Sequence, residues 1–201
     1  MIALVDYDAG NLKSVEKALV HLGEEPIITR ERDIILKADK VILPGVGAFG
    51  DAMGKLKFYH MADVIREVVT RNIPLLGICV GLQLLFDSSS ESAGVEGLNI
   101  VKGKILRIPD NGNLKIPHMG WNSLTIKPGT KLFKGIPDQS YVYFVHSYYP
   151  KAEDDRIVAA TTQYGTEIDA AIETGNIYAC QFHPEKSGDV GLMILKNFID
   201  L

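Results

Sequence analysis

The chain has 201 residues, of which 46% are hydrophobic and 23% charged, and its formal net charge is -4. The length suits one compact α/β domain over residues 1–201 and leaves little room for a second. No run of Lys or Arg stands out, and apolar stretches such as residues 73–80 are too short to span a bilayer. Nucleic acid and membranes are therefore not expected as partners.

The N-terminus carries no basic leader, and Asp6 interrupts its apolar run early. We interpret this segment as a first strand and not as a secretory signal. The two cysteines, Cys79 and Cys180, both lie in apolar surroundings. Without an export signal, we expect reduced thiols and a cytoplasmic protein.

The first half of the chain alternates short β-branched runs with helical patterns. Four segments are typical of strands: residues 2–6, 26–29, 40–43 and 73–78. Apolar residues at helical spacing predict a helix over residues 11–22 and another around residues 64–69, and a third should run from the fourth strand through residues 84–86. This alternation predicts a mostly parallel central sheet that is flanked by helices.

The second half is richer in strands. Six more segments are strand-like: residues 105–108, 123–126, 141–145, 157–162, 168–172 and 177–182. Turn signals at residues 110–112 and 128–129 separate some of them, so we expect several to add to the sheet in antiparallel fashion. A helical pattern over residues 190–199 closes the chain.

The sharpest motif is LLGICVGLQ at residues 75–83. A buried strand runs into G-x-C-x-G, and these glycines permit a strained strand-to-helix turn that presents Cys79 above the sheet. A thiol at a helix N-terminus also lies near the positive end of the helix dipole, which favours the thiolate. Gln83 shares a helix face with Cys79 and can offer its amide to a substrate. The alternative is an inert buried cysteine, against which the two glycines weigh.

A second motif, QFHPEK at residues 181–186, follows an apolar strand. A nucleophilic thiol needs a general base, and an imidazole suits this role at neutral pH. Glu185, two residues after His183, can hold the imidazole in its working tautomer. Both side chains should lie at the carboxyl edge of the sheet with Cys79. The spacing of the histidines and cysteines does not suit a metal site.

The glycine-rich segment PGVGAFG at residues 44–50 follows the third strand. Its glycines let the backbone approach a ligand and turn an amide toward a developing oxyanion. A plain turn remains an alternative. The spacing G-x-G-x-x-G also invites a nucleotide-binding reading, which we disfavour because that fingerprint belongs after the first strand.

Together these motifs resemble the class I (triad) glutamine amidotransferases, a flavodoxin-like fold, and more closely the glutaminase subunit of imidazole glycerol phosphate synthase. The segments PHMGWN and PGVG distinguish this subfamily, whereas the elbow and HPE motifs are shared more widely. Many amidotransferases carry His where this chain has Leu82. The matching segments follow family order along the chain: residues 6–14, 44–53, 76–86, 116–122, 143–148 and 181–188.

The resemblance implies that Cys79 attacks the glutamine carboxamide, that His183 shuttles the proton and that Glu185 orients His183. The oxyanion would be held by the amide of Val80 and by the Val46–Gly47 peptide, which in this family turns inward only when the partner subunit is occupied. The resemblance implies no cofactor and no metal. The substrate glutamine would be gripped by Gly47, Gln83, Ser147 and Tyr148.

The implied partner is a (βα)₈-barrel cyclase subunit, which would use the ammonia on the ribonucleotide PRFAR in histidine biosynthesis. The residues expected to face this partner are Asn11, Trp121, Tyr143 and Lys186. For Trp121, a place in the core and a place in the interface are equally expected. His118 and His146 should support loops beside the site.

Two other functions stay open at this point. The chain could be a glutaminase that serves another synthetase, in anthranilate or pyridoxal phosphate synthesis, because the elbow and HPE motifs would suit either. It could also be a non-enzymatic binding domain on the same fold, since a fold alone does not determine activity. The complete set of triad residues disfavours the second alternative.

Overall fold

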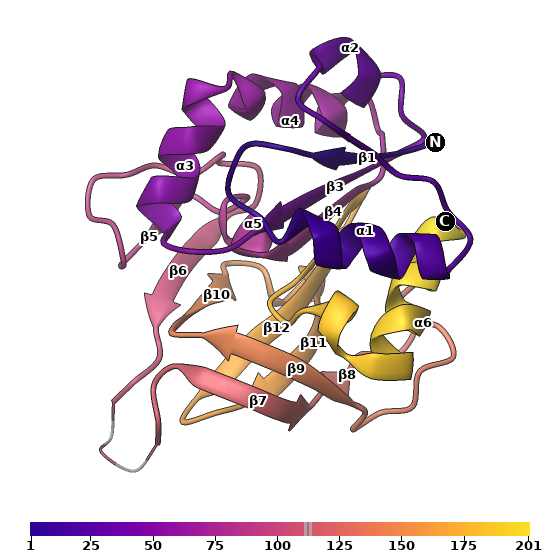
Figure 1. Cartoon of the computed structure of the whole chain (residues 1–201). Helices are drawn as coiled ribbons and strands as arrows, with labels where there is room; N and C mark the ends of the chain where they lie inside the picture. The colour runs from indigo at the N-terminus through magenta and orange to yellow at the C-terminus, as the bar shows by residue number, and fades with distance from the viewer. Residues whose placement is uncertain (111, 113) are drawn as a thin grey trace.

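The computed structural model describes residues 1–110, 112 and 114–201, and its centre is an eight-stranded sheet in the order β2-β1-β3-β4-β13-β12-β11-β8 (Figure 1). Five strands form a parallel half, in which β1 pairs with β2 and β3, and β4 pairs with β3 and β13. Their bounds are Ile2–Val5 (β1), Ile27–Thr29 (β2), Lys40–Gly45 (β3), Leu75–Cys79 (β4) and Ile177–Cys180 (β13).

Three further strands extend this sheet in antiparallel fashion: β12 (Glu167–Thr174), β11 (Val158–Gln163) and β8 (Thr125–Ile126). A three-stranded sheet contains β10 (Tyr148–Ala152), β6 (Gly103–Arg107) and β5 (Ser88–Ser89), and a two-stranded ribbon pairs β7 (His118–Ser123) with β9 (Tyr141–His146). The predicted α/β class, with a mostly parallel sheet and antiparallel additions, is confirmed.

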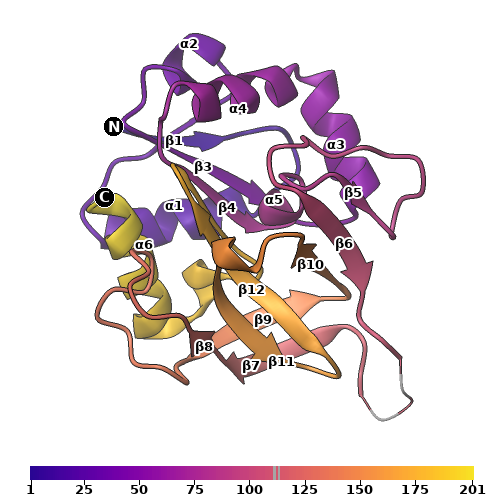
Figure 2. The same ribbon diagram turned by 180° about the vertical axis from the view of Figure 1, so that it is seen from behind.

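Helices cover both faces of the parallel half (Figure 1 and Figure 2). On one face lie α1 (Leu12–His21) and α6 (Gly188–Ile199), and on the other lie α2 (Arg32–Ile35), α3 (Phe49–Phe58) and α4 (Met61–Thr70). One cluster of buried apolar side chains runs from Ile2 to Phe198 through both layers. In the described part of the chain, no helix is both long and apolar enough to cross a bilayer.

The strand register brings three distant loops to one edge of the sheet. Gly45 at the end of β3 lies opposite Cys79 at the end of β4, and Cys180 at the end of β13 lies opposite Ile78. In parallel strands the carboxyl ends meet at a common edge, which is where ligands bind in open α/β sheets. The loops after β3, β4 and β13 therefore converge there.

Several predicted boundaries were wrong. Helix α5 (Val80–Gln83) is a single turn and does not continue through residues 84–86, because all three of those side chains are fully buried and the chain turns into the core. Strands β5, β7 and β10 and helices α2 and α3 were missed. The turn expected at residues 110–112 includes residue 111, which lies outside the described residues.

Candidate active site

The turn after β4 holds Cys79 in a strained conformation. Its backbone has φ 55° and ψ −112°, in the positive-φ region that L-residues rarely adopt. A Cβ on Gly81 would lie 1.9 Å from the carbonyl oxygen of Leu43, so only glycine lets this turn lie against β3. Gly81 therefore permits the elbow that the G-x-C-x-G pattern predicts.

The helix after the elbow is too short for the dipole that the sequence implied. Helix α5 has four residues, whereas a macrodipole is the sum of many aligned peptide units. The basic group beside the Cys79 thiol is instead the imidazole of His183, which lines the same pocket. His183 therefore takes the place of the helix as the group that can activate the thiol, acting as its general base.

His183 and Glu185 form a buried pair just after β13. The Nδ1 atom of His183 lies 2.8 Å from Oε1 of Glu185, and both side chains are almost completely buried. Burial lowers the pKa of His183, but its hydrogen bonds with Cys79 and Glu185 outweigh burial and raise the pKa to about 9. The second carboxylate oxygen of Glu185 is buried without a hydrogen-bond partner among the described residues. The His183 ring, which contacts the first oxygen, is therefore the group that stabilises the carboxylate.

The backbone of His183 is anchored to strand β9 by a residue that the sequence did not single out. The hydroxyl of Ser187 donates to the carbonyl of His183 at 2.6 Å and accepts from the amide of Tyr143 at 3.0 Å. The amide of His183 in turn donates to the carbonyl of Tyr143 at 2.9 Å. Ser187 and β9 thus keep the imidazole at the elbow.

A pocket of about 300 Å³ opens beside the triad, a volume suited to a small ligand. It brings together all of the predicted substrate and oxyanion residues with the thiol and the imidazole. A larger groove of about 960 Å³ near the C-terminus of α6 contains neither cysteine nor histidine. The residues lining the smaller pocket are Val46, Gly47, Cys79, Val80, Gln83, Glu91, Pro117, Val145, His146, Ser147, Tyr148 and His183.

The side-chain amide group of Gln83 donates both of its protons to hydrogen bonds within the protein. Its Nε2 atom donates to the carbonyl of Tyr148 at 3.1 Å and to Oε1 of Gln181 at 3.0 Å. Both amide protons are used in this way, so Gln83 presents its oxygen to a ligand as an acceptor and not its amide donor. Gln181, which the sequence did not identify, also places its Nε2 3.7 Å from Sγ of Cys79.

The glycine-rich loop after β3 is held against the loop after β1. The amide of Val46 donates to the carbonyl of Ala9 at 3.3 Å, and the buried hydroxyl of Tyr7 donates to the carbonyl of Pro44 at 2.7 Å. Gly47 has φ +89° and nothing within 4 Å of a Cβ position, so this peptide has room to reorient. Pro44 and Gly45, predicted as part of the turn, belong to strand β3.

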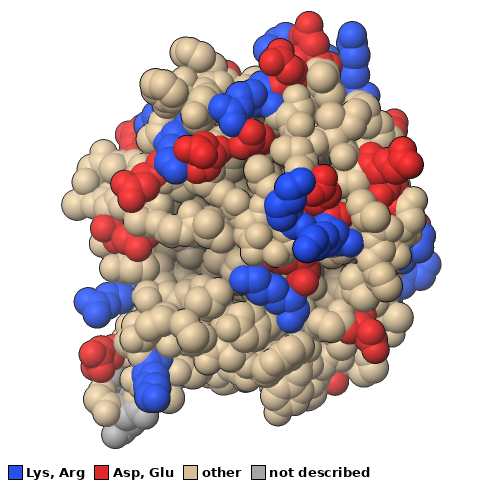
Figure 3. Space-filling view, in the orientation of Figure 1, with Lys and Arg blue, Asp and Glu red and all other residues tan. Residues whose placement is uncertain are grey.

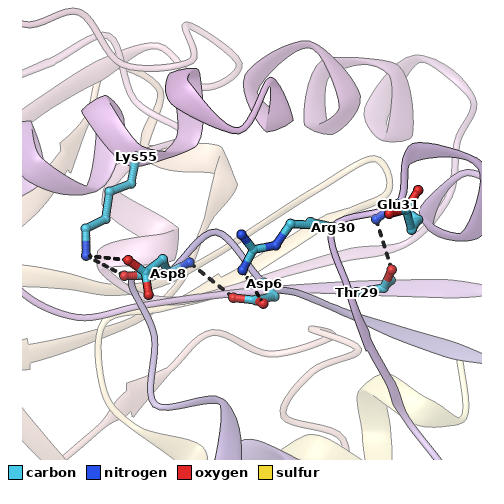
Figure 4. A network of polar contacts seen from close by, with 6 residues as sticks. All are labelled: Asp6, Asp8, Thr29, Arg30, Glu31 and Lys55. Carbon is cyan, nitrogen blue, oxygen red and sulfur yellow. Dashed lines mark hydrogen bonds and ion pairs between the residues drawn. The ribbon is translucent and has the colours of Figure 1, made fainter.

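Ion pairs fix the loop after β1 from both sides (Figure 4). Arg30 lies 2.5 Å from the carboxylate of Asp6, and Lys55 on α3 donates to the carbonyl of Asp8 at 2.5 Å and pairs with its carboxylate at 3.3 Å. Burial would raise the pKa of Asp6, but its hydrogen bonds with Arg30 and the Asp8 amide hold it below the usual value. This network positions the Ala9 carbonyl that receives the Val46 amide.

Glu91 lines the pocket, although no sequence motif pointed to it. Its Oε2 atom accepts from the amide of Phe49 at 2.8 Å, so it caps the first turn of α3. It is also the one carboxylate among the residues that line the pocket.

The predicted partner-facing residues lie on four elements: Asn11 is the N-cap of α1, Lys186 follows His183 in the turn Pro184–Lys186, Tyr143 lies on β9 and Trp121 on β7. Trp121 is 55% exposed, which excludes the core placement, and its ring meets that of Tyr143 edge-on at 6.1 Å. Lys186 is exposed, and Asn11 and Tyr143 are half-buried. Figure 3 shows that the surface over β7 and β9 is largely uncharged, with Lys and Arg gathered beside it.

The remaining titratable groups near the site differ from Cys79 and His183. Burial raises the pKa of the Cys180 thiol well above its ordinary value, so this cysteine stays protonated. His118 and His146 are buried and contact each other, and His146 lines the pocket. In the described part of the chain, no group of three or more His, Cys, Asp or Glu residues could hold a metal ion.

Comparisons with known proteins show the family of this chain. The family model for class I glutamine amidotransferases matches residues 3–201. The imidazole glycerol phosphate synthase subunit HisH of Caldanaerobacter subterraneus subsp. tengcongensis is 52% identical over 198 residues, 98% of this chain and 97% of that protein. The HisH subunit of Methanothermobacter thermautotrophicus is 49% identical over 205 residues, 100% of this chain and 98% of that protein.

Among solved structures, one described as the crystal structure of glutamine amidotransferase has a TM-score of 0.76 at 19% identity, over 98% of this chain and 99% of that one. At this identity the likeness concerns the fold alone. The resemblance that the motifs predicted is confirmed by the family model and by the full-length relatives. The chain belongs to the class I glutamine amidotransferase family and, within it, to the group of imidazole glycerol phosphate synthase HisH subunits.

Proposed function

We propose that this chain is the glutaminase subunit of an imidazole glycerol phosphate synthase, which hydrolyses glutamine to glutamate and ammonia. The observation that carries the proposal is that Cys79 and His183 line one pocket of about 300 Å³, with Glu185 paired to the far side of the His183 ring. A strained thiol, an imidazole in contact with it and a buried carboxylate on the imidazole form a nucleophile, a general acid–base and its orienting group.

In the proposed reaction the Cys79 thiolate attacks the carbonyl carbon of the glutamine side-chain amide. The carbon–nitrogen bond breaks as the His183 imidazolium gives its proton to the nitrogen, so ammonia leaves and a γ-glutamyl thioester remains. Water then attacks this thioester while His183 accepts a proton from it. Glutamate is released when the carbon–sulfur bond breaks and the thiolate is restored.

The negative charge that develops on the former carbonyl oxygen needs hydrogen-bond donors near the elbow. The amide of Val80, the first residue after Cys79, and the Val46–Gly47 peptide are the proposed donors; each such donor contributes on the order of 10²–10³ in rate. Val46 is tied to Ala9 and Gly47 has room to turn, which supports a loop that completes the oxyanion hole by reorienting. Hydrolysis by the isolated chain is therefore expected to be slow.

The glutamine head group would occupy the outer part of the pocket. Ser147 and Tyr148 line it from β10 and the residue before it, and Gln83, whose amide protons are used within the protein, has its side-chain oxygen left to accept from the ligand. The carboxylate of Glu91 complements the α-ammonium group of an amino-acid substrate. No metal or organic cofactor enters the proposed reaction.

The relatives' shared name describes a subunit of imidazole glycerol phosphate synthase, so the chain is one component of a larger enzyme. We propose that its partner is a (βα)₈-barrel cyclase which receives the ammonia and carries out the lyase step on PRFAR in the cytoplasm. The largely uncharged surface over β7 and β9, with Trp121 exposed on β7 and Tyr143 next to it on β9, supports docking there, and Asn11 and Lys186 are further proposed contacts. We propose that residues 1–201 act as one amidotransferase domain, which the main core cluster supports because it includes residues from Ile2 to Phe198.

The test compares glutamine hydrolysis by the chain alone and with the cyclase and its ligand. Replacing Cys79 with Ser should reduce glutaminase activity at least ~10³-fold and leave cyclisation with free ammonia intact. Absence of glutamine turnover in the wild-type complex would refute the proposal. A glutaminase for anthranilate or pyridoxal phosphate synthesis is not favoured, since relatives at about 50% identity along the full length carry the imidazole glycerol phosphate synthase name.

A further inference from the structure

Two buried histidines face each other across the β7–β9 ribbon. His118 at the start of β7 is the register partner of His146 at the end of β9, and both are more than nine-tenths buried. Neither ring contacts the triad through a hydrogen bond, so the proposed reaction leaves them without a role. His146 nevertheless lines the pocket.

The two rings form a hydrogen-bonded chain that ends on the pocket wall. Nδ1 of His146 lies 2.9 Å from the carbonyl oxygen of Tyr148, Nδ1 of His118 lies 3.0 Å from Nε2 of His146, and the side-chain amide of Asn122 lies 3.4 Å from Nε2 of His118. The carbonyl oxygen can only accept, so His146 must carry its proton on Nδ1. His118 must then donate from its own Nδ1, and Asn122 donates to the remaining nitrogen.

Aromatic stacking keeps the outer ring of this chain in place. His118 stacks on Tyr164 with ring centroids 3.9 Å apart and on Phe144 at 4.7 Å, with interplanar angles of 16° and 21°. The hydroxyl of Tyr164 is itself held by the carbonyl of Lys115 at 2.7 Å. Packing therefore fixes the ring plane, and the hydrogen bonds fix the tautomer.

Burial keeps both imidazoles neutral. Desolvation lowers the pKa of His118 to about 4. Desolvation also lowers the pKa of His146 to about 3, against the raising effect of its hydrogen bond with the Tyr148 carbonyl. Around neutral pH each ring has one donor and one acceptor, as a directed chain requires.

The hydrogen-bonded chain of the two histidines ends at the carbonyl oxygen of Tyr148, which has no acceptor position left. The oxygen of Tyr148 accepts from His146 and, at 3.1 Å, from Gln83, so both of its lone pairs are occupied within the protein. The peptide group that carries this oxygen is set by two side chains from different elements. Its neighbours Ser147 and Tyr148 form one wall of the pocket.

We propose that His118 and His146 are positioning residues for glutamine: through a directed chain from Asn122 to the Tyr148 carbonyl, they set the wall of the pocket against which the amino-acid head group binds. The inference rests on the proposed glutaminase function and concerns substrate binding, not the bond-breaking steps. Breaking this hydrogen-bonded chain should weaken binding of glutamine and of the transition state alike. Such a change raises KM and leaves kcat nearly unchanged.

Two substitutions of His118 separate hydrogen bonding from packing. His118→Asn keeps a donor near the Nδ1 position and loses the stacking, whereas His118→Phe keeps the stacking and loses the donor. In the complex with the cyclase we expect His118→Phe to raise the KM for glutamine about 5- to 10-fold with kcat changed less than about 2-fold, as one lost buried hydrogen bond implies. His118→Asn should stay closer to the wild type in KM although its unfolding temperature falls.

The reverse order, with the phenylalanine variant normal in KM and the asparagine variant impaired, would overturn the proposal and leave a packing role only. If His118→Phe does not fold, His146→Asn and His146→Leu make the same comparison at the ring that touches Tyr148. His21→Asn, at an exposed position at the end of α1, is the matched control. A wild-type complex that did not hydrolyse glutamine would refute the proposed function instead.

A measurement that needs no turnover tests the hydrogen-bonded chain of His118 and His146 directly. Nitrogen-15 NMR of the imidazoles reports which ring nitrogen carries the proton. Both rings should be neutral with the proton on Nδ1 between pH 8 and pH 6, and an Nε2-protonated or charged form of either ring would overturn the inference.

Discussion

The two cysteines show how position decides reactivity at the scale of a single residue. Cys79 lies in a positive-φ turn beside an imidazole, whereas Cys180 lies inside β13 with no exposed surface. The same thiol group is therefore presented in one case and protonated and inert in the other. A cysteine-directed glutamine analogue should modify only Cys79.

The pH dependence of hydrolysis should report the His183–Glu185 pair. The pKa of His183 is raised from 6.5 to about 9, so the imidazolium that protonates the leaving ammonia is present up to that pH. We expect kcat/KM in the complex to fall as the pH rises through about 9. Glu185→Gln should move this alkaline limb to lower pH because it removes the charge that stabilises the imidazolium.

The raised pKa of His183 also makes the free energy of unfolding depend on pH. Because the folded pKa of His183 lies above its unfolded value, the stabilisation is complete below pH 6.5 and is lost as the pH rises from 6.5 toward 9. An alkaline limb that is identical in wild type and Glu185→Gln would contradict the assigned role of the carboxylate.

Glu91 gives a second prediction at this scale. If its carboxylate receives the α-ammonium of glutamine, Glu91→Gln should raise KM about 10-fold or more, since hydrogen bonds to charged groups are worth about 1.5–3 kcal/mol. The amide oxygen of Gln still caps Phe49, so α3 should keep its stability. Steady-state kinetics with thermal unfolding as a control would show this; equal KM values would exclude the contact.

At the scale of elements, two glycines that both lie in helices have opposite expected effects when replaced by alanine. Gly81→Ala should lower the free energy of unfolding by at least ~2 kcal/mol, because its Cβ would lie 1.9 Å from the Leu43 oxygen. Gly54 lies in the interior of α3 with nothing within 4 Å of a Cβ position. Gly54→Ala should raise stability by about 0.5–1 kcal/mol. Urea unfolding of both variants checks the pair.

Prediction from sequence succeeded for elements with a strong local pattern and failed for the others. Strands β3 and β4 were found because they are continuous apolar runs that helices cover on both sides. Strand β7 (HMGWNS) was missed because its outward positions are Met119 and Trp121 and its inward ones include His118, so polarity does not alternate as in a half-buried strand. The length of α5 was overestimated because Leu84, Leu85 and Phe86 are all apolar, so no change in polarity marks the end of the helix.

At the scale of the whole molecule, the exposed aromatic surface should decide partner binding. We expect Trp121→Ala to weaken binding of the cyclase by about 2 kcal/mol, near 30-fold in Kd, as is typical of an exposed tryptophan at the centre of an interface. Stability should change little, because the side chain is 55% exposed.

The control for this prediction is Phe58→Ala at the end of α3, which removes a 75% exposed aromatic side chain from another part of the surface. Calorimetric titration of both variants with the cyclase would distinguish a docking surface from general surface hydrophobicity. Equal affinities of wild type and Trp121→Ala would exclude this face.

The sequence alone determined the parallel half of the sheet, the elbow and the chemical groups of the triad, because each depends on local rules of periodicity, glycine geometry and residue chemistry. Only the tertiary structure decided which distant groups meet. Pairing of β13 with β4 brings His183 to Cys79, and pairing of β7 with β9 creates the His118–His146 chain. Ser187, Gln181 and Glu91 gave no signal, because a single side chain has no period and its role depends on neighbours far along the chain.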